Sequence, residues 1–408
     1  MYWAAKIRKF EQTADGSISF FLKLRKRIQT LHQAFGLGLG SLIEMIIFMQ
    51  KNPKLMDITK KSTLMLFPRV NKWIVIIFVI ALSVAGFRGY QIYSYIFEPN
   101  ILSPGSIKIP LNATYEQVID SLKKHDIIMN YKAFDWVAQR KKYPQAIKPG
   151  KYLLDKGLNT NEILNMLRSG NQIPVQVTFN NLRFINELAG AVSKYIEPDS
   201  VELLRKFSDP LIHEKFGFTE SNFHCMFIPN TYEFYWTTTA DQFLERMSME
   251  YKHFWNEGRK NEALALGLTP EEVMTVASIV QEETNKKDEK PTVAGLYINR
   301  IKRGMPLQAD PTVKFALGNF RIKRVLKSHL EIDSPYNTYK YPGLPPGPIN
   351  FPEISSIEAV LHATKTPYIY MCARQDFSGY HNFSKNLSGH NENARKYKAA
   401  LDSLEIYQ

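Results

Sequence analysis

The sequence contains little cysteine. Only two of its 408 residues are Cys, and these two, Cys225 and Cys372, each stand beside apolar residues. Two cysteines cannot build a disulfide framework in a chain of this length, and no Cys or His residues show the spacing of a zinc site. We therefore expect two single buried thiols, and we expect neither a metal nor a cofactor.

Basic clusters of the kind that bind nucleic acid are also missing from most of the chain. The formal net charge is +13, but residues 1–72 carry 13 Lys or Arg against four Asp or Glu, a net of +9. This excess precedes the apolar run Trp73–Phe87 instead of covering a folded face. The pattern is typical of a membrane topology signal, so no nucleic-acid partner is expected.

The apolar run and the aromatic residues behind it predict a membrane anchor over residues 73–97. Fifteen apolar residues fall short of the roughly 20 that span a bilayer, but the charge of Arg88 can reach the interface while Ile92–Phe97 complete the span. Small residues near the end of the run leave a cleaved signal peptide as the alternative. We favour an uncleaved anchor because of the flanking residues.

The charge asymmetry places residues 1–72 in the cytoplasm and the chain from about residue 98 outside the cytoplasmic (inner) membrane. Residues 1–55 contain no segment long enough to span and no clear helix caps. They form either an amphipathic cytoplasmic arm or a stretch that is not translated. In the second case translation would start at Met56 or Met65, and the protein would begin with a short basic segment before the anchor.

The exported part predicts an α+β chain with two domains. Residues 101–174 form a small α+β module: a strand near 106–110 is followed by helices that begin with capping boxes at Thr114 and Asn159. Roughly seventy residues suit a binding module better than an enzyme, although a spacer is the alternative. Residues 175–408 form a larger mixed α/β domain.

The stretch from Thr269 to Glu283 predicts the central helix of that domain. Thr269 is the expected N-cap, with Pro270 at the first helical position and Glu272 completing a capping box. An apolar face at helical spacing follows and leads onto Glu283. This face consists of Val273, Val276, Ala277 and Val280.

The helical phase distinguishes two neighbouring glutamates. Glu283 continues the apolar face, so we expect burial to raise the pKa of its carboxyl and to let it donate a proton near neutral pH. Glu282 is turned about 100° away and is expected to be solvated and paired with Lys286. A Glu near a helix end is usually a surface residue, so phase alone leaves both interpretations of Glu283 open.

Residues 277–384 carry a series of motifs that resembles a known family. In order they are A-S-I-V-Q-E-E-T, Y-I-N-R, G-M-P-L-Q-A-D-P-T-V, Y-N-T-Y, G-L-P-P-G-P-I, H-A-T-K-T-P-Y-I-Y and H-N-F-S. Together with the anchor and the small module, they are similar to the YceG-like endolytic murein transglycosylases (MltG family). The resemblance covers residues 98–408.

The resemblance implies a lytic transglycosylase, a lyase that cuts nascent peptidoglycan strands internally between MurNAc and GlcNAc. The products would end in 1,6-anhydroMurNAc, and cleavage would terminate strand elongation. The family's catalytic glutamate falls on Glu283, and the module at 101–174 is similar to a glycan-binding LysM-like domain. The implied partners are peptidoglycan strands and peptidoglycan synthases (penicillin-binding proteins).

Other polar residues have weaker signals. Asp310 is expected to be an N-cap, and the histidines lack metal-ligand spacing and are expected to form structural or substrate hydrogen bonds. The candidates for orienting the sugar lie in loops, where each can equally form a loop hydrogen bond. These candidates are Gln308, Asn337 and Tyr339, and the histidines are His362, His381 and His390.

Two other classes of function stay open at this point. A non-catalytic, membrane-anchored cell-wall binding or scaffold protein would use Glu283 only as a satisfied buried acid. A hydrolase would use a second carboxylate, such as Asp310, to activate water. The mass of the product separates the three classes.

The charge asymmetry yields a first prediction. A reporter that is active only after export, fused to the C-terminus, is expected to be active in cells, because residues 73–97 should leave the rest of the chain outside the cytoplasm. A second reporter that is active only in the cytoplasm provides the control. Activity of this second fusion would show that the topology is the reverse of the one predicted and would rule out a cell-wall function.

Overall fold

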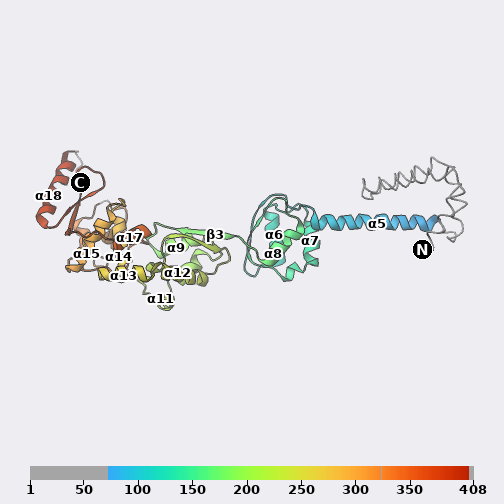
Figure 1. Cartoon of the computed structure of the whole chain (residues 1–408), viewed down its shortest axis with the longest axis horizontal. Helices are drawn as coiled ribbons and strands as arrows, with labels where there is room; N and C mark the ends of the chain where they lie inside the picture. Colours follow the sequence, from blue (N-terminus) through green and yellow to red (C-terminus); the bar gives the residue numbers. More distant parts are fainter. Residues whose placement is uncertain (1–71, 323, 404–408) are drawn as a thin grey trace, which may run out of the picture. The chain divides into compact units, whose positions relative to one another are not determined.

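The computed structural model describes residues 72–322 and 324–403 (Figure 1). The predictions for residues 1–71 lie outside the described residues. The chain divides into two units after Tyr90, and each unit is considered separately.

Helix α5 (Lys72–Phe97) corresponds to the predicted anchor. It is 26 residues long and buries none of them within the protein. At about 1.5 Å per residue such a helix exceeds the roughly 30 Å hydrocarbon core of a bilayer. The prediction of one apolar N-terminal helix is confirmed, because α5 is long and apolar enough to cross a membrane.

The second unit begins with a small core built on one antiparallel strand pair. Strands β1 and β2 pair in register from Gly105 with Leu154 to Ile109 with Gly150, and the predicted capping boxes at Thr114 and Asn159 are both present. Side chains from all the elements form one apolar cluster. The elements are β1 (Gly105–Ile109), α6 (Tyr115–Lys124), α7 (Tyr131–Arg140), η1 (Tyr143–Gln145), β2 (Gly150–Leu154) and α8 (Thr160–Ser169).

A second and larger apolar cluster begins with strand β3. The alternating sequence of β3 buries every second side chain, as its period predicts. Its antiparallel partner, β4, was not recognised in the sequence. The elements of this part are β3 (Pro174–Phe179), α9 (Ile185–Val192), α10 (Ser200–Phe207), α11 (Pro210–Phe216), η2 (Phe223–Met226), β4 (Asn230–Tyr235), α12 (Ala240–Phe254) and α13 (Glu257–Leu266).

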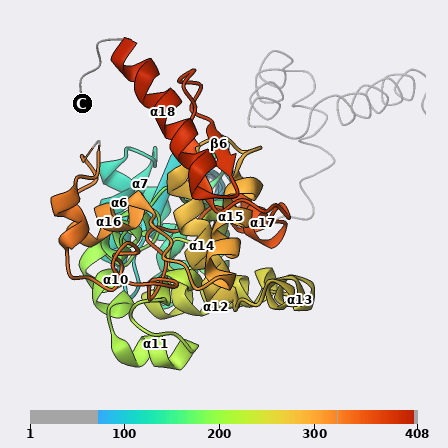
Figure 2. The ribbon, with the colours of Figure 1, turned by 90° about the vertical axis from the view of Figure 1, so that its left-hand side faces the viewer.

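Two helices pack against the predicted central helix, α14, and against each other. Helix α14 contacts both α15 and α17, which also contact each other (Figure 2). As a result, every residue of α14 from Val273 to Val280 is buried. The remaining elements are α14 (Pro270–Glu283), α15 (Lys290–Lys302), α16 (Asp310–Leu317), η3 (Lys327–Glu331), α17 (Ile354–Leu361), β5 (Tyr370–Ala373), β6 (His381–Ser384) and α18 (Leu387–Ser403).

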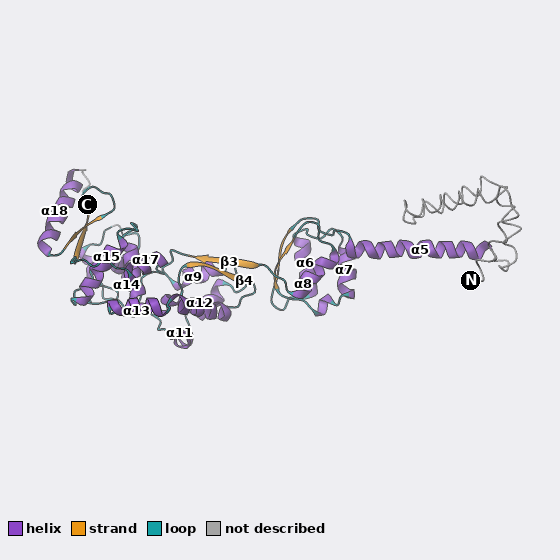
Figure 3. Ribbon diagram, in the orientation of Figure 1, coloured by secondary structure: helices purple, strands orange, loops and turns teal. Residues whose placement is uncertain are grey.

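The described residues therefore form a mixed helical and stranded structure, as predicted, with three antiparallel strand pairs (Figure 3). The segment 336–339 has no helix or strand, as expected for the loops that carry Asn337 and Tyr339, but part of it is buried. Asn337 and Thr338 are buried. Their side chains bond to neighbouring backbone groups, so an irregular segment can be buried without leaving those groups unsatisfied.

The close approach of α15 to the segment after α17 yields a prediction. A Cβ added at Gly295 would lie 2.2 Å from the carbonyl oxygen of Thr364. Gly295→Ala should lower the free energy of unfolding by ~1–3 kcal/mol, because the two backbones must separate even though Ala is the better helix former.

Gly190→Ala in α9 is the matched control, because a Cβ there meets nothing within 4 Å. It should raise the free energy of unfolding by up to ~1 kcal/mol. Denaturant unfolding of the full chain in detergent measures both variants. Equal stability changes in the two variants would show that the close contact imposes no constraint.

Candidate active site

Glu283 is the last residue of α14, and its carboxyl faces a pocket of about 200 Å³. The helix begins as predicted, with the Thr269 hydroxyl accepting from the Glu272 N–H and the Glu272 carboxylate accepting from the Thr269 N–H. Burial raises the pKa of Glu283 to about 7. A substantial fraction of this carboxyl is therefore protonated at neutral pH, as the helical phase suggested.

Tyr297 on α15 is the hydrogen-bond partner of this carboxyl. Its hydroxyl donates to Glu283 Oε1 at 2.7 Å, and this bond opposes the effect of burial on the pKa of Glu283. Burial also raises the pKa of Tyr297 well above its ordinary value, so its hydroxyl stays protonated. The charge of Asp310 raises the pKa of Glu283 further, whereas His381 lowers it.

Arg300 ties the walls of the pocket together. The side chain is 6% exposed. Its Nε donates to the carbonyl oxygen of Ile369, just before β5, and its terminal nitrogen donates to the carbonyl oxygen of Leu307 at 2.7 Å. The buried guanidinium thus joins α15 to the residue before β5 and to the loop before α16. The full lining is Glu283, Leu296, Tyr297, Arg300, Leu307, Gln308, Asp310, Met371, Cys372, Ala373 and His381.

Gln308, predicted to orient the sugar, lies in the pocket with Glu283. Its backbone has φ +52°, in the left-handed region that non-glycine residues rarely adopt. A bond from its N–H to the Thr338 carbonyl and one from Arg300 to its Oε1 hold it there. Such strain is concentrated at functional sites, which agrees with the predicted role.

The predicted N-cap role of Asp310 is wrong. Helix α16 begins at Asp310 itself, with Ala309 as its N-cap and no side-chain capping bond. The carboxylate instead accepts a hydrogen bond from the Tyr339 hydroxyl at 2.5 Å and lines the pocket. Tyr339 therefore contacts a pocket residue, Asp310, but does not itself line the pocket.

Asn337 is the one predicted substrate-binding residue that the structure keeps entirely within the loop. It is fully buried. Its side-chain N–H groups donate to the carbonyl oxygens of Leu330 and Ile332. Its amide is therefore committed to the loop hydrogen bonds that were the alternative interpretation, and it is not among the residues that line the pocket.

The predicted pairing of Glu282 with Lys286 is also wrong. Glu282 accepts two hydrogen bonds from Arg183, at 2.9 and 3.2 Å, and one from Asn350. Its side chain is 23% exposed, so it is not fully solvated. The i to i+4 rule fails because α14 ends at Glu283, which leaves Lys286 outside the helix.

The remaining residues of interest divide between the pocket and other places. His381 lines the pocket, whereas His362 is exposed beside Glu358 and His390 stacks on Tyr370. Both cysteines are free, as predicted, but Cys372 is only partly buried. Sequence reasoning missed the roles of Tyr297 and Arg300, although the Y-I-N-R motif places them three residues apart on one helical face.

Comparisons with known proteins identify the family of this chain. The model of the YceG-like family matches residues 107–396, and the chain belongs to this family. An endolytic murein transglycosylase of Bacillus subtilis (strain 168) is 32% identical over 307 residues, which cover 72% of this chain and 84% of that protein.

Two further proteins are also similar to this chain. An endolytic murein transglycosylase of Streptococcus pneumoniae serotype 2 is 25% identical over 361 residues, covering 79% of this chain and 64% of that protein. The crystal structure of a putative yceG-like protein from Listeria monocytogenes is 26% identical and has a TM-score of 0.47. The match covers 71% of this chain and 98% of the Listeria chain.

The raised pKa of Glu283 predicts a pH-dependent cost in stability. Between the ordinary value of 4.5 and about 7 the folded state binds more protons than the unfolded state, so the free energy of unfolding falls as pH rises through this window. The full shift corresponds to ~3 kcal/mol. Glu283→Gln should therefore match the wild type near pH 4.5 and exceed it in stability by up to this amount at pH 8.

Denaturant unfolding of both proteins at the two pH values measures the difference. Glu282→Gln is the control, since losing the ion pair with Arg183 should lower stability by ~1 kcal/mol at pH 8. A Glu283→Gln advantage that is the same at both pH values would contradict the raised pKa.

Proposed function

We propose that this chain is an endolytic murein transglycosylase that uses Glu283 as its acid. The observation that carries the proposal is a carboxyl with a pKa of about 7 facing a pocket. Such a group can donate a proton at neutral pH, which glycosidic bond cleavage requires. The curated relatives named endolytic murein transglycosylase support the same reaction.

The proposed reaction cleaves the bond between MurNAc and GlcNAc with one carboxyl group. Glu283 gives its proton to the bridging O4 as the bond from O4 to the MurNAc C1 breaks. The C6 hydroxyl of the same MurNAc then bonds to C1, and its proton passes to the Glu283 carboxylate. The product is a 1,6-anhydroMurNAc end, and Glu283 returns to its starting form.

Tyr297 and the pocket lining suit Glu283 to both half-reactions. The Tyr297 hydroxyl fixes the orientation of the carboxyl at 2.7 Å and can stabilise the carboxylate after the proton has left. Gln308 is proposed to contact the sugar directly, with Tyr339 holding Asp310 beside it. The loop around Asn337 is proposed to act as a support, because the Asn337 amide bonds to backbone groups of the loop itself.

A hydrolase is the second candidate, because a specific observation favours it. Asp310 places a second carboxylate on the same pocket as Glu283, and glycosidases that use water need such a pair. The two reactions differ in the product: the hydrolase leaves a reducing MurNAc end, one water heavier than the anhydro form. A non-catalytic scaffold leaves the strands uncut.

The cellular setting is proposed from α5 and the small module. We propose that α5 anchors the chain in the cytoplasmic membrane as a single-pass protein, with its N-terminus in the cytoplasm and its pocket outside. The module at residues 101–174 is proposed to be LysM-like and to bind glycan, while residues 175–408 cut it. Cleavage of nascent strands would terminate their elongation beside peptidoglycan synthases.

Glu283→Gln tests the proposed acid. Gln has nearly the same volume but no proton to give, so cleavage of purified peptidoglycan strands should fall by about 10²- to 10⁴-fold. Mass spectrometry of the wild-type products should find anhydro ends. Glu282→Gln is the control, and it should keep near-normal cleavage below its unfolding temperature because its partner Arg183 does not line the pocket.

The product mass also decides between the candidates. Reducing ends would favour the hydrolase. Uncut strands with the folded wild-type protein would favour the scaffold. Equal loss of cleavage in the two Gln variants would show that the acid has been assigned to the wrong residue.

A further inference from the structure

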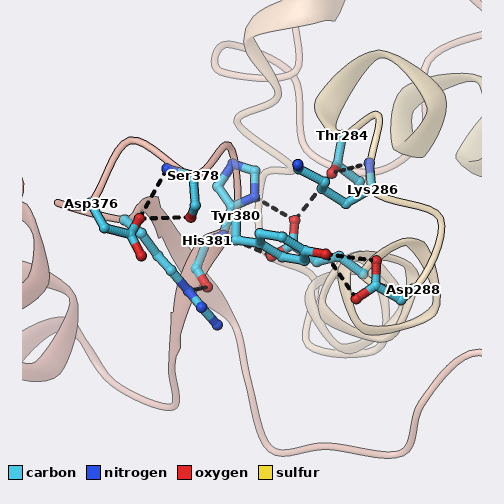
Figure 4. Close-up of polar contacts among 9 residues, drawn as sticks. Thr284, Lys286, Asp288, Asp376, Ser378, Tyr380 and His381 are labelled. Carbon is cyan, nitrogen blue, oxygen red and sulfur yellow. Dashed lines mark hydrogen bonds and ion pairs between the residues drawn. The ribbon is translucent and has the colours of Figure 1, made fainter.

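The hairpin of β5 and β6 carries a histidine that the proposed reaction does not use. His381 is the first residue of β6, and its Nδ1 lies 2.8 Å from Glu289 Oε2. Glu289 is 5% exposed. Its carboxylate also accepts from the backbone N–H of His381 at 2.7 Å and from the hydroxyl of Thr284 at 3.1 Å. In Figure 4, dashed lines lead from both His381 and Thr284 to the same carboxylate oxygen.

The carboxylate determines which ring nitrogen of His381 carries the proton. An ionised carboxylate only accepts hydrogen bonds, so Nδ1 must be the donor. In the neutral ring Nε2 is then an acceptor, as for the histidines that a carboxylate orients beside metal ions. Nε2 has no hydrogen-bond partner among the described residues, and His381 is one of the residues that line the pocket with Glu283.

We infer that His381 is a substrate-contacting residue and that Glu289 is its positioning residue. Nε2 accepts a hydrogen bond from a hydroxyl or an acetamido N–H of the sugar bound beside Glu283. Because the pocket holds only about 200 Å³, a sugar group that reaches Glu283 also lies close to this ring. The inference rests on the proposed function, since it takes a glycan as the ligand.

The His381 ring is not needed to hold the β5–β6 hairpin in place. The backbone N–H of His381 already bonds to Glu289 without it. The preceding residue supplies another link, because the Tyr380 hydroxyl donates to both oxygens of Asp288 and the Lys286 ammonium lies 4.8 Å from the Tyr380 ring centroid (Figure 4). A ring with one nitrogen held by a buried carboxylate and the other facing a pocket is suited to a ligand.

Two substitutions at His381 separate the two ring nitrogens. The amide N–H of Asn can take the place of Nδ1 and keep the bond to Glu289, but Asn cannot reach the pocket. The amide of Gln reaches the place of Nε2 and offers a carbonyl acceptor, but it loses Glu289. One neutral hydrogen bond corresponds to about a 3- to 10-fold change in affinity. His381→Asn should therefore raise KM by about this factor with kcat within about threefold, and His381→Gln should restore most of the loss.

Binding without turnover makes the test independent of the reaction. The affinity for purified, uncleaved strands is measured for Glu283→Gln alone and together with His381→Asn, each as the full chain in detergent. The double variant should bind about 3- to 10-fold more weakly. The KM of Glu289→Gln should lie between those of the wild type and His381→Asn, because the His381 ring stays but loses the carboxylate that orients it.

Tyr380→Phe is the control for hairpin anchoring, since it removes the bond to Asp288 and leaves His381 unchanged. Its kinetics should match the wild type. The inference is overturned if His381→Asn keeps the wild-type KM while His381→Gln is impaired, or if Tyr380→Phe reproduces the His381→Asn defect. Failure of the wild type to cut strands overturns the proposed function instead, and leaves the binding comparison to decide on His381.

Discussion

The structure depends on a carboxyl group held at the end of a buried helix. A charged carboxylate is costly to remove from water, so burial without a full counter-charge favours the protonated acid. Helix α14 creates this situation because Val273 to Val280 are buried and Glu283, at the end of the helix, lines a small pocket. The Tyr297 hydroxyl limits the shift, so the pKa stays near 7 instead of rising to a value at which no proton would be released.

The elements around α14 are joined by buried polar groups that have hydrogen-bond partners inside the protein. Ser278 in the middle of α14 accepts from the N–H of Ile349, and its own hydroxyl donates to the Thr275 carbonyl. Arg300 similarly bonds carbonyl oxygens from two walls. Because these buried groups have partners, irregular segments can pack closely around the acid without helices or strands of their own. Most of the pocket lining itself lies on helices α14, α15 and α16 and on strands β5 and β6.

Local sequence signals predicted the features that depend on neighbouring residues. The capping box at Thr269 and the raised pKa of Glu283 follow from spacing within one helix, and both agree with the structure. The errors arise where distant segments decide the outcome. Glu282 pairs with Arg183, 99 residues away, and Asp310 bonds to Tyr339 instead of capping its helix. The spacing of residues within one helix or strand cannot predict contacts between segments so far apart in the sequence. The assignment of Glu283 as the catalytic residue stays a prediction.

The two adjacent glutamates show how one helix end places two carboxyl groups in different surroundings. Side chains one residue apart diverge by about 100°, so Glu282 reaches Arg183 and Asn350 while Glu283 reaches Tyr297. The guanidinium balances the charge of Glu282 outside the pocket. The carboxylate that raises the pKa of Glu283 is Asp310, on the pocket itself. A ligand that enters the pocket and displaces water or contacts Asp310 would therefore change the acidity of Glu283 directly, while the ion pair of Glu282 would stay outside its reach.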